Sequence, residues 1–263
     1  MIANSTIIAM AASSIILIGF LIGIFWILRK KVGIKFVPLA IGAVFFVIFA
    51  LVLEQNLHGV ILQPNAQGQI PLMINHPFVY IIYGIFAAGI FEETARLVAF
   101  ILLKKSYSNF SSGFAYGLGH GGMEALVIGG GSLLSNLVIS LLLSDPNTEL
   151  AQELPQSVIQ TLQNAPSSDF FLVVVERIPA LFVQICLSLL VWIAVNNSQK
   201  FWLFPLSILL HALIDLPSAM AQVGFLTNVA VVYSLLYVMA IALILFTVQV
   251  VKRNKLDPLK KVT

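Results

Sequence analysis

Long blocks of apolar residues alternate with short polar segments along the whole of this 263-residue chain. Each block is long enough for a helix that crosses the hydrocarbon core of a bilayer, which takes about 20 residues. The pattern therefore predicts an all-α, polytopic membrane protein with about seven transmembrane helices. The predicted spans cover approximately residues 6–28, 36–54, 77–103, 110–142, 170–195, 201–221 and 226–251.

Composition agrees with this pattern, because 59% of the residues are hydrophobic and only 10% are charged, whereas soluble domains average about 25% charged residues. The formal net charge of +3 lies in small clusters beside the apolar blocks, which excludes a nucleic-acid-binding stripe. The single cysteine, Cys186, excludes an intrachain disulfide. We expect one transmembrane domain over residues 1–263 in a bacterial plasma membrane, with the bilayer as its surroundings. The sequence carries no signal for the oligomeric state.

The basic residues predict the orientation of the chain. Twelve of the 14 Lys and Arg residues follow spans one, three, five and seven, whereas the loops at 55–76, 143–169 and 222–225 contain none. By the positive-inside rule, the N-terminus lies outside and the C-terminus is cytoplasmic. The first span is expected to stay in the protein, because a basic cluster follows it and nothing charged precedes it.

Glycines make the fourth apolar block unusual. Three consecutive glycines at 129–131 predict a break or a re-entrant turn. Gly113, Gly117 and Gly121 recur every four residues, a spacing that lets a neighbouring helix approach closely.

Ionisable side chains inside the predicted spans are the main functional signal. Each one costs roughly 2.5–3.5 kcal/mol near the bilayer centre unless it is paired, protonated or metal-bound. Five carboxylates against two arginines leave a formal charge of −3, which a divalent cation would reduce to −1. These residues are Glu92, Glu93, Arg96, Glu124, Glu176, Arg177 and Asp215, accompanied by His120 and His211.

Three different spans bring such groups to one depth. Glu93, His120 and His211 each lie 10 or 11 residues from the predicted cytoplasmic end of their span, which places them roughly 15–17 Å into the bilayer. On the third span, Arg96 lies three residues from Glu93 and four from Glu92, so it can pair with either acid.

Each histidine also has an acid one helical turn away. His120 precedes Glu124 by four residues, and His211 precedes Asp215 by four. Two imidazoles and a carboxylate form a ligand set of the catalytic-zinc kind, here His120, Glu124 and His211. A further glutamate can accept the proton of a water, and the other acids can orient the histidines. Arg96 would orient a glutamate or hold developing negative charge.

Three motifs carry a resemblance to a known family. They are EETAR at 92–96, GHGGME at 119–124 and HALID at 211–215. Together they resemble the YhfC family of intramembrane metalloproteases, which is similar to the group of CAAX prenyl endopeptidases, bacteriocin-processing (CPBP) proteins and PrsW proteases. The resemblance covers approximately residues 77–220, which would be the catalytic core.

The resemblance implies a buried protease site that is reached from the cytoplasmic side and cleaves a peptide in or beside the membrane. Glu92 would be the general base, His120 would position the water, and His211 would be a metal ligand or an oxyanion donor. Asp215 stands where many prenyl endopeptidases have Asn, and an ionised Asp cannot donate to an oxyanion. It would therefore orient a histidine or face a metal, and a prenylated substrate is not implied. The motifs leave open both a metal-dependent and a metal-free glutamate mechanism.

Other interpretations stand beside this one. A transporter that relays protons or cations also carries acids and histidines at the bilayer midplane, although the chain shows no inverted repeat. A catalytically silent scaffold or immunity protein is a third class. Glu176 and Arg177 are expected to form a structural ion pair, and His58 and His76 are expected to be solvated at the outer edge.

Overall fold

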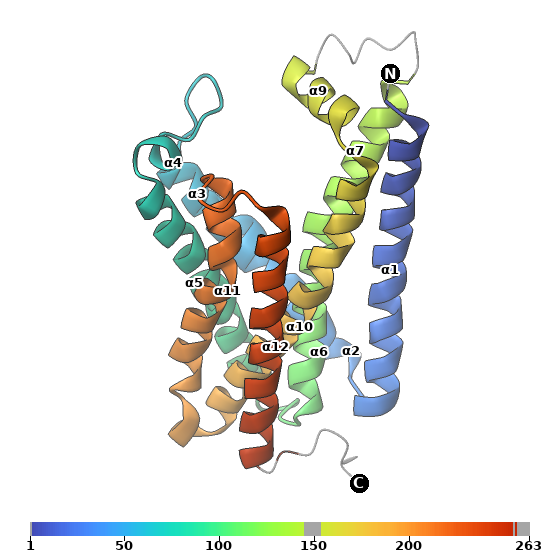
Figure 1. Cartoon of the computed structure of the whole chain (residues 1–263). Helices are drawn as coiled ribbons and strands as arrows, with labels where there is room; N and C mark the ends of the chain where they lie inside the picture. Colours follow the sequence, from blue (N-terminus) through green and yellow to red (C-terminus); the bar gives the residue numbers. More distant parts are fainter. Residues whose placement is uncertain (1, 145–153, 255, 257–263) are drawn as a thin grey trace. The chain divides into compact units, whose positions relative to one another are not determined.

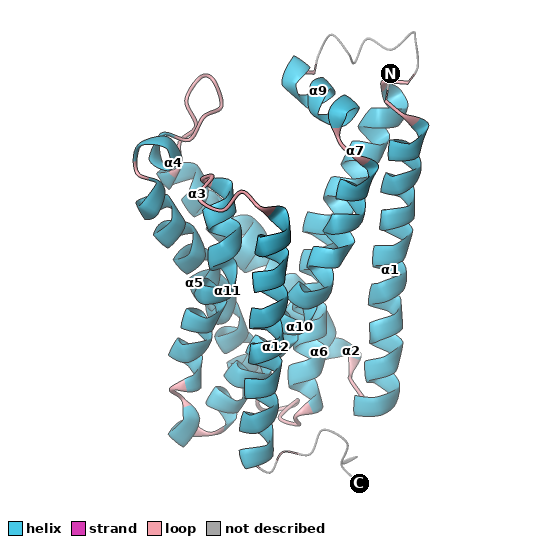
Figure 2. Ribbon diagram, viewed as in Figure 1, coloured by secondary structure: helices cyan, strands magenta, loops and turns pink. Residues whose placement is uncertain are grey.

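The computed structural model describes residues 2–144, 154–254 and 256, and this part of the chain contains helices and loops but no strand (Figures 1 and 2). Two of the helical runs include a π-helical segment, η1 and η2. The elements are α1 (Asn4–Val32), α2 (Phe36–Phe46), η1 (Val47–Glu54), α3 (Gln55–Ile61), α4 (Pro71–Asn75), α5 (Pro77–Leu103), α6 (Ser111–Glu124), η2 (Ala125–Gly130), α7 (Gly131–Leu142), α9 (Gln156–Asn164), α10 (Ser167–Asn196), η3 (Ser198–Lys200), α11 (Leu203–Gln222) and α12 (Val229–Arg253).

Six helical runs in the described residues are long and apolar enough to cross a membrane: Asn4–Val32, Phe36–Ile61, Ser111–Leu142, Ser167–Asn196, Ser198–Gln222 and Val229–Arg253. The chain is therefore a multi-pass integral membrane protein. The remaining predicted span corresponds to α5, a helix of 27 residues that carries Glu92, Glu93 and Arg96. These three charges lower its apolar character, so a seventh crossing and the orientation stay predictions.

The structure changes two of the predicted spans. The second helical run continues past residue 54 to Ile61, which puts His58 on a helix. The predicted break at 129–131 is wrong, because the chain passes from α6 through η2 into α7 without leaving a helical path. A π-helical turn absorbs the local irregularity there instead. The basic residues Lys255, Lys260 and Lys261 lie outside the described residues.

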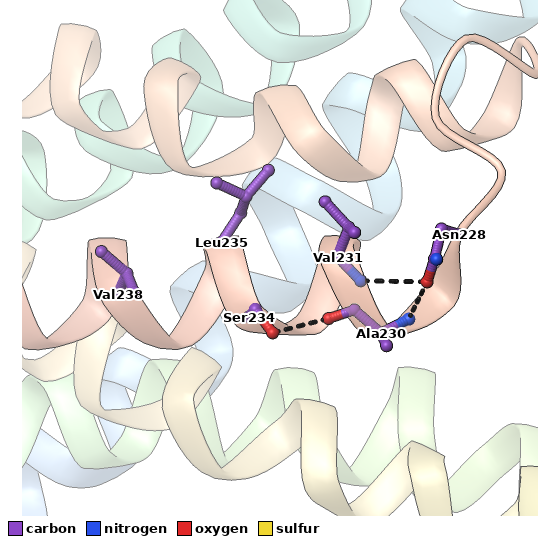
Figure 3. Close-up of a pocket in the computed structure, with 6 residues that line it drawn as sticks. All are labelled: Asn228, Ala230, Val231, Ser234, Leu235 and Val238. Carbon is purple, nitrogen blue, oxygen red and sulfur yellow. Dashed lines mark hydrogen bonds between the residues drawn. The ribbon is translucent and has the colours of Figure 1, made fainter.

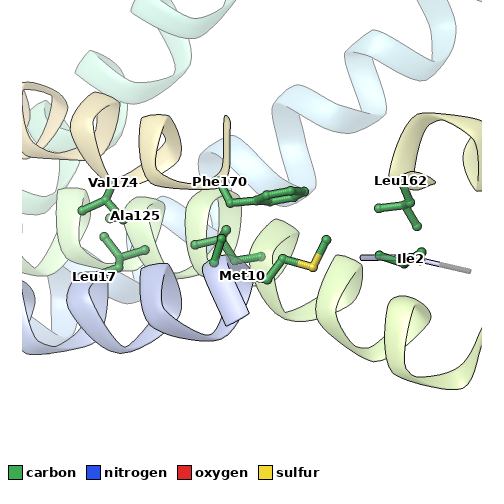
Figure 4. Packing of buried hydrophobic residues seen from close by; sticks show 9 residues of the cluster. Ile2, Met10, Leu17, Ala125, Leu162, Phe170 and Val174 are labelled. Atoms are coloured by element: carbon green, nitrogen blue, oxygen red, sulfur yellow. The ribbon is translucent and has the colours of Figure 1, made fainter. Parts of the chain in front are cut away.

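The described contacts divide the chain into two compact units. The first comprises Met1–Ile27 and Glu124–Ile178, and the second comprises Leu28–Met123 and Pro179–Thr263. The first unit is held by apolar side chains from α1 and the residues just before it, η2, α7, α9 and α10 (Figure 4): Ile2, Ala9, Met10, Leu17, Ala125, Leu133, Leu162, Phe170 and Val174. The single-domain assignment stays a prediction.

In the second unit, α5 packs along α11, and α2 and η1 pack on α5. The predicted glycine face of α6 is confirmed as a close contact with the Pro179–Asn196 part of α10. A Cβ atom built on Gly113, Gly117 or Gly121 would come within 2.9, 2.7 and 2.7 Å of Leu189, Ile185 and Gln184, respectively.

The opposite side of α6 is equally close to α2. A Cβ on Gly119 would lie 1.9 Å from the Leu39 carbonyl oxygen, and a Cβ on Gly42 would lie 2.2 Å from that of Tyr116. Both neighbours are backbone atoms, which cannot swing away as a side chain can. The two helices thus meet backbone to backbone at His120, whose backbone nitrogen would lie 2.9 Å from a Cβ on Gly42.

We expect Gly42→Ala to destabilise the protein by about 1–3 kcal/mol, because the added methyl group forces α2 and α6 apart. The matched control is Gly19→Ala on α1, where an added Cβ meets nothing within 4 Å. This control should be neutral or slightly stabilising, since Ala favours a helix by up to about 1 kcal/mol over Gly. Thermal unfolding of both variants in detergent measures the difference, and equal melting temperatures would contradict the close contact.

Candidate active site

Glu92 is the centre of a hydrogen-bonded group that joins α5, α6 and α10. Its Oε2 atom lies 2.9 Å from Nε2 of His120 and accepts a hydrogen bond of 3.0 Å from Nε2 of Gln184. Nη2 of Arg96 lies 3.4 Å from the same oxygen. One carboxylate oxygen is thus held by three donors or potential donors from three helices, all within the second unit.

Glu93, the next residue, contacts a different helix and joins α5 to α11. Its Oε1 atom lies 2.7 Å from Nη1 of Arg96 and 2.8 Å from Nδ1 of His211. Nε2 of His211 in turn lies 3.5 Å from Oδ2 of Asp215. The consecutive acids therefore each face one of the two histidines, Glu92 facing His120 and Glu93 facing His211.

Arg96 connects the two halves of this network. It is fully buried and bridges both glutamates, whereas the sequence predicted pairing with either one. Its guanidinium also donates to Oγ of Ser188, at 3.2 Å, and to Oε1 of Gln184. The orientation of both carboxylates is thereby tied to one planar cation with several fixed donors.

Gln184 and Ser188 were missed by the sequence analysis. Both lie on α10, four residues apart, so they share one face of the helix and meet the arginine together. The only available signal was a pair of neutral polar residues within an apolar block. Such residues also occur as ordinary contacts between membrane helices.

The ring of His120 packs against two aromatic side chains. It is fully buried, Oη of Tyr116 lies 3.4 Å from its Nδ1, and the edge of Phe46 lies against its ring at a centroid distance of 5.2 Å. Aromatic contacts from two helices thus fix the ring so that Nε2 faces Glu92. The acid next to His120 is therefore Glu92 from another helix, and not Glu124, the acid one turn along its own helix.

Glu124 lies in the first unit and is paired with an arginine. Its Oε1 atom lies 3.0 Å from Nη1 of Arg177, and Nη2 of Arg177 also contacts Glu176 at 2.5 Å. The predicted structural pair between Glu176 and Arg177 is confirmed, with Glu124 as its third member. The stem of Arg177 packs over Gly129, where an added Cβ would lie 2.9 Å from its Cγ.

The types of residue in the network fit a divalent metal, because two imidazoles and two carboxylates meet within it. Glu93 Oε2 is also buried, with no hydrogen-bond partner among the described residues. The arrangement does not bring three ligands together, since no three His, Cys, Asp or Glu side chains of the described residues are grouped as a metal site. We therefore derive no step of a reaction through a metal.

His58 differs from its expected solvated state, whereas His76 is exposed as predicted. Nε2 of His58 lies 3.2 Å from Oε1 of Glu54, and its Nδ1 lies 2.7 Å from the hydroxyl of Tyr83. Glu54 is itself buried and was not among the predicted polar residues. The prediction failed because it ended the second span at residue 54.

Comparison with known proteins adds a family to this geometry. A family model described as "YhfC intramembrane metalloprotease" matches residues 14–236. The chain belongs to the YhfC intramembrane metalloprotease family. A relative in Bacillus subtilis (strain 168), named "Uncharacterized membrane protein YhfC", is 34% identical over 238 residues, which cover 88% of this chain and 91% of the relative. No solved structure matches the chain.

The resemblance read from the three motifs is thus confirmed at the level of the family. The family's name implies a peptidase and a metal, but it identifies neither the metal nor the substrate. The candidate metal ligands are the acids and histidines of the network around Glu92 and Glu93, and Glu124.

We expect metal content to survive Glu124→Gln and to be lost in a His120→Ala, His211→Ala double variant. Arg177 holds the Glu124 carboxylate, whereas both histidines lie in the network with the unpartnered Oε2 of Glu93. Mass spectrometry of gently purified protein gives the metal per chain. Loss of metal in Glu124→Gln would restore Glu124 as a ligand, and a metal-free wild type would favour a metal-free glutamate mechanism.

Proposed function

We propose that this member of the YhfC family is an intramembrane peptidase that cleaves a peptide bond within or beside the bilayer, with Glu92 as the general base. The observation that carries the proposal is the double pairing of consecutive glutamates with histidines of two other helices, bridged by one buried arginine. A structural ion pair needs one acid and one arginine. The second acid and the two histidines exceed that need.

Glu92 suits the role of base better than Glu93. The Glu92 side chain retains 9% of its exposure, whereas the Glu93 side chain retains none. A base must reach a water molecule, so the acid with accessible surface is favoured. Glu93 then orients His211, and Arg96 positions both carboxylates.

In the proposed reaction, Glu92 takes a proton from a water molecule, and the resulting hydroxide oxygen bonds to the carbonyl carbon of the peptide. Nε2 of His211 gives up its 3.5 Å contact with Asp215 and donates a hydrogen bond to the oxyanion, while Glu93 holds the imidazole through Nδ1. Glu92 then returns the proton to the amide nitrogen as the carbon–nitrogen bond breaks. None of these steps depends on a metal. In the proposed metal-bound form, His120 and His211 would be the ligands, with zinc as the first candidate, and the metal would supply Lewis acidity.

Orientation belongs to the same proposal. We infer seven crossings with an outer N-terminus and a cytoplasmic C-terminus, because the basic clusters follow alternate helices. In this orientation, the N-terminal end of α5 and the C-terminal end of α11 lie at the outer surface of the membrane. The proposal of one catalytic core over approximately residues 77–220 follows from the elements that supply the network.

The test is to reconstitute purified protein in lipid vesicles with a mixture of membrane proteins and to map new N-termini by mass spectrometry. New termini that appear with the wild type and are missing with Glu92→Gln would support the peptidase. Ion flux into protein-loaded vesicles without any cleavage would support the transporter. Neither flux nor cleavage, with retained binding of a partner by Glu92→Gln, would support the scaffold.

A further inference from the structure

A pocket of about 310 Å³ lies beside the proposed centre, entirely within the second unit. Three helices supply its polar lining, which comprises His58 of α3, Tyr80 and Tyr83 of α5, and Asp215, Ser218 and Gln222 of α11. Small and apolar residues, among them glycine and alanine, complete the wall. A pocket of this size with a few convergent polar groups is the usual form of a site for a small group or a side chain.

The polar wall is held in place by contacts between helices. Tyr83 is hydrogen-bonded to His58, which also contacts Glu54, as described above. Between two other lining residues, the hydroxyl of Tyr80 donates a 3.0 Å hydrogen bond to Oε1 of Gln222. The lining groups are therefore arranged before any ligand arrives, which reduces the entropy lost on binding.

The charge of the pocket favours a cation. The side chain of Asp215 is 40% exposed where it lines the pocket, and the carboxyl group of Glu54 stands behind His58. No Lys or Arg occurs among the described residues that line it. The lining also includes two tyrosines, Tyr80 and Tyr83, a residue type whose ring face attracts a cation.

Asp215 also links the pocket to the proposed centre. Its carboxylate contacts Nε2 of His211, whose Nδ1 contacts Glu93. A group held at Asp215 would therefore lie one side chain away from the proposed reacting atoms. We propose that this pocket binds a Lys or Arg side chain of the peptide substrate, next to the bond to be cleaved. That the bound side chain belongs to a substrate rests on the proposed peptidase function. The binding of a cation in this pocket does not depend on that function.

Thiol labelling tests the pocket without any proteolysis. In a Cys186→Ala background, Ser218→Cys places a reactive group on the pocket wall. A cationic methanethiosulfonate reagent should react with this thiol about tenfold faster than an anionic one, because Asp215 attracts the first and repels the second. Adding Asp215→Asn should reduce the ratio several-fold. Gly84→Cys is a second reporter, since a Cβ there meets nothing within 4 Å.

The matched control is a shallow hollow on α12 that has no charged lining (Figure 3). Ser234→Cys in this hollow should give a ratio near that of a free thiol, unchanged by Asp215→Asn. The hollow is lined by Asn228, Ala230, Val231, Ser234, Leu235 and Val238.

Competition identifies the ligand. N-acetyl-arginine methylamide should slow labelling of Ser218→Cys, whereas N-acetyl-norleucine methylamide and choline should not. Gly84→Leu should block labelling by filling the pocket, while Gly23→Leu on α1, another site with open space, should not. Equal protection by choline would overturn a peptide side chain in favour of a lipid headgroup. Equal rates for both labelling reagents would overturn the cation site altogether.

The two proposals fail separately. If labelling and protection occur as expected but no cleavage is found, the pocket stands as a cation site and the peptidase does not. If cleavage occurs and the mapped sites show no Lys or Arg near the broken bond, the peptidase stands and the pocket assignment is overturned.

Discussion

Glu92→Gln is expected to lower the rate of peptide cleavage by about 10²–10⁴-fold, the usual contribution of a positioned general base. Glutamine keeps the size of the side chain and an oxygen that can accept from His120 and Gln184, so the network should survive. What it loses is the ability to take a proton from water. Cleavage of one mapped membrane substrate, measured at a series of protein concentrations in vesicles, gives the ratio of rates.

The matched control is Glu176→Gln, which also removes a carboxylate that is paired with an arginine. The Glu176 side chain is 35% exposed and lies in the first unit, so cleavage should stay within about twofold of the wild type. Unchanged cleavage by Glu92→Gln, in protein that elutes and melts as the wild type does, would remove Glu92 from the reaction. A Glu93→Gln variant would then be the next candidate for the base.

Arg96→Met is expected to cost about 3–5 kcal/mol of stability, because it leaves two buried carboxylates without their shared cation. For a protein of this size, the melting temperature should fall by on the order of 10 °C. Arg96→Lys should restore only part of this loss, since an ammonium group cannot reach both carboxylates and Gln184 from one plane. Thermal unfolding in a single detergent measures all three proteins.

Arg253→Met serves as the control for the loss of an arginine. It removes an exposed residue from the end of α12, and such surface changes usually stay within about 0.5 kcal/mol. A melting temperature of Arg96→Met within 2 °C of the wild type, a limit well below the roughly 10 °C expected, would mean that the carboxylates find other partners or a shared proton. The bridging role of the arginine would then be wrong.

The positions of the charged residues along the chain predicted much of the network. Three spans carried polar groups to one depth, and in the second unit Glu92, Glu93, His120 and His211 do meet. Helical spacing also predicted the contact of His211 with Asp215. Such predictions succeed because an unpaired charge is so costly in a bilayer that each one must find a partner.

Spacing along one helix did not predict the partner of a charged residue where a residue from another helix was also within reach. His120 and Glu124 are four residues apart, yet His120 contacts Glu92 and Glu124 contacts Arg177. A single sequence does not reveal which helices are neighbours, so it cannot rank such partners. The same limit hid Gln184, whose polar amide gave no sign of the arginine that it meets.

The backbone contacts on both sides of α6 also restrict how a substrate can arrive. A peptide that enters between two helices must separate them by at least the thickness of its own backbone, and adjacent extended chains in a sheet lie about 4.7–4.9 Å apart. Gly42 and Gly119 close the seam with α2, and Gly117 and Gly121 close the seam with α10. Neither of these helix contacts can open to admit a peptide from the lipid unless helices that touch at their main chains separate. For the peptidase proposed above, these two contacts leave the α5 and α11 side of the second unit as the expected approach of a peptide to His120.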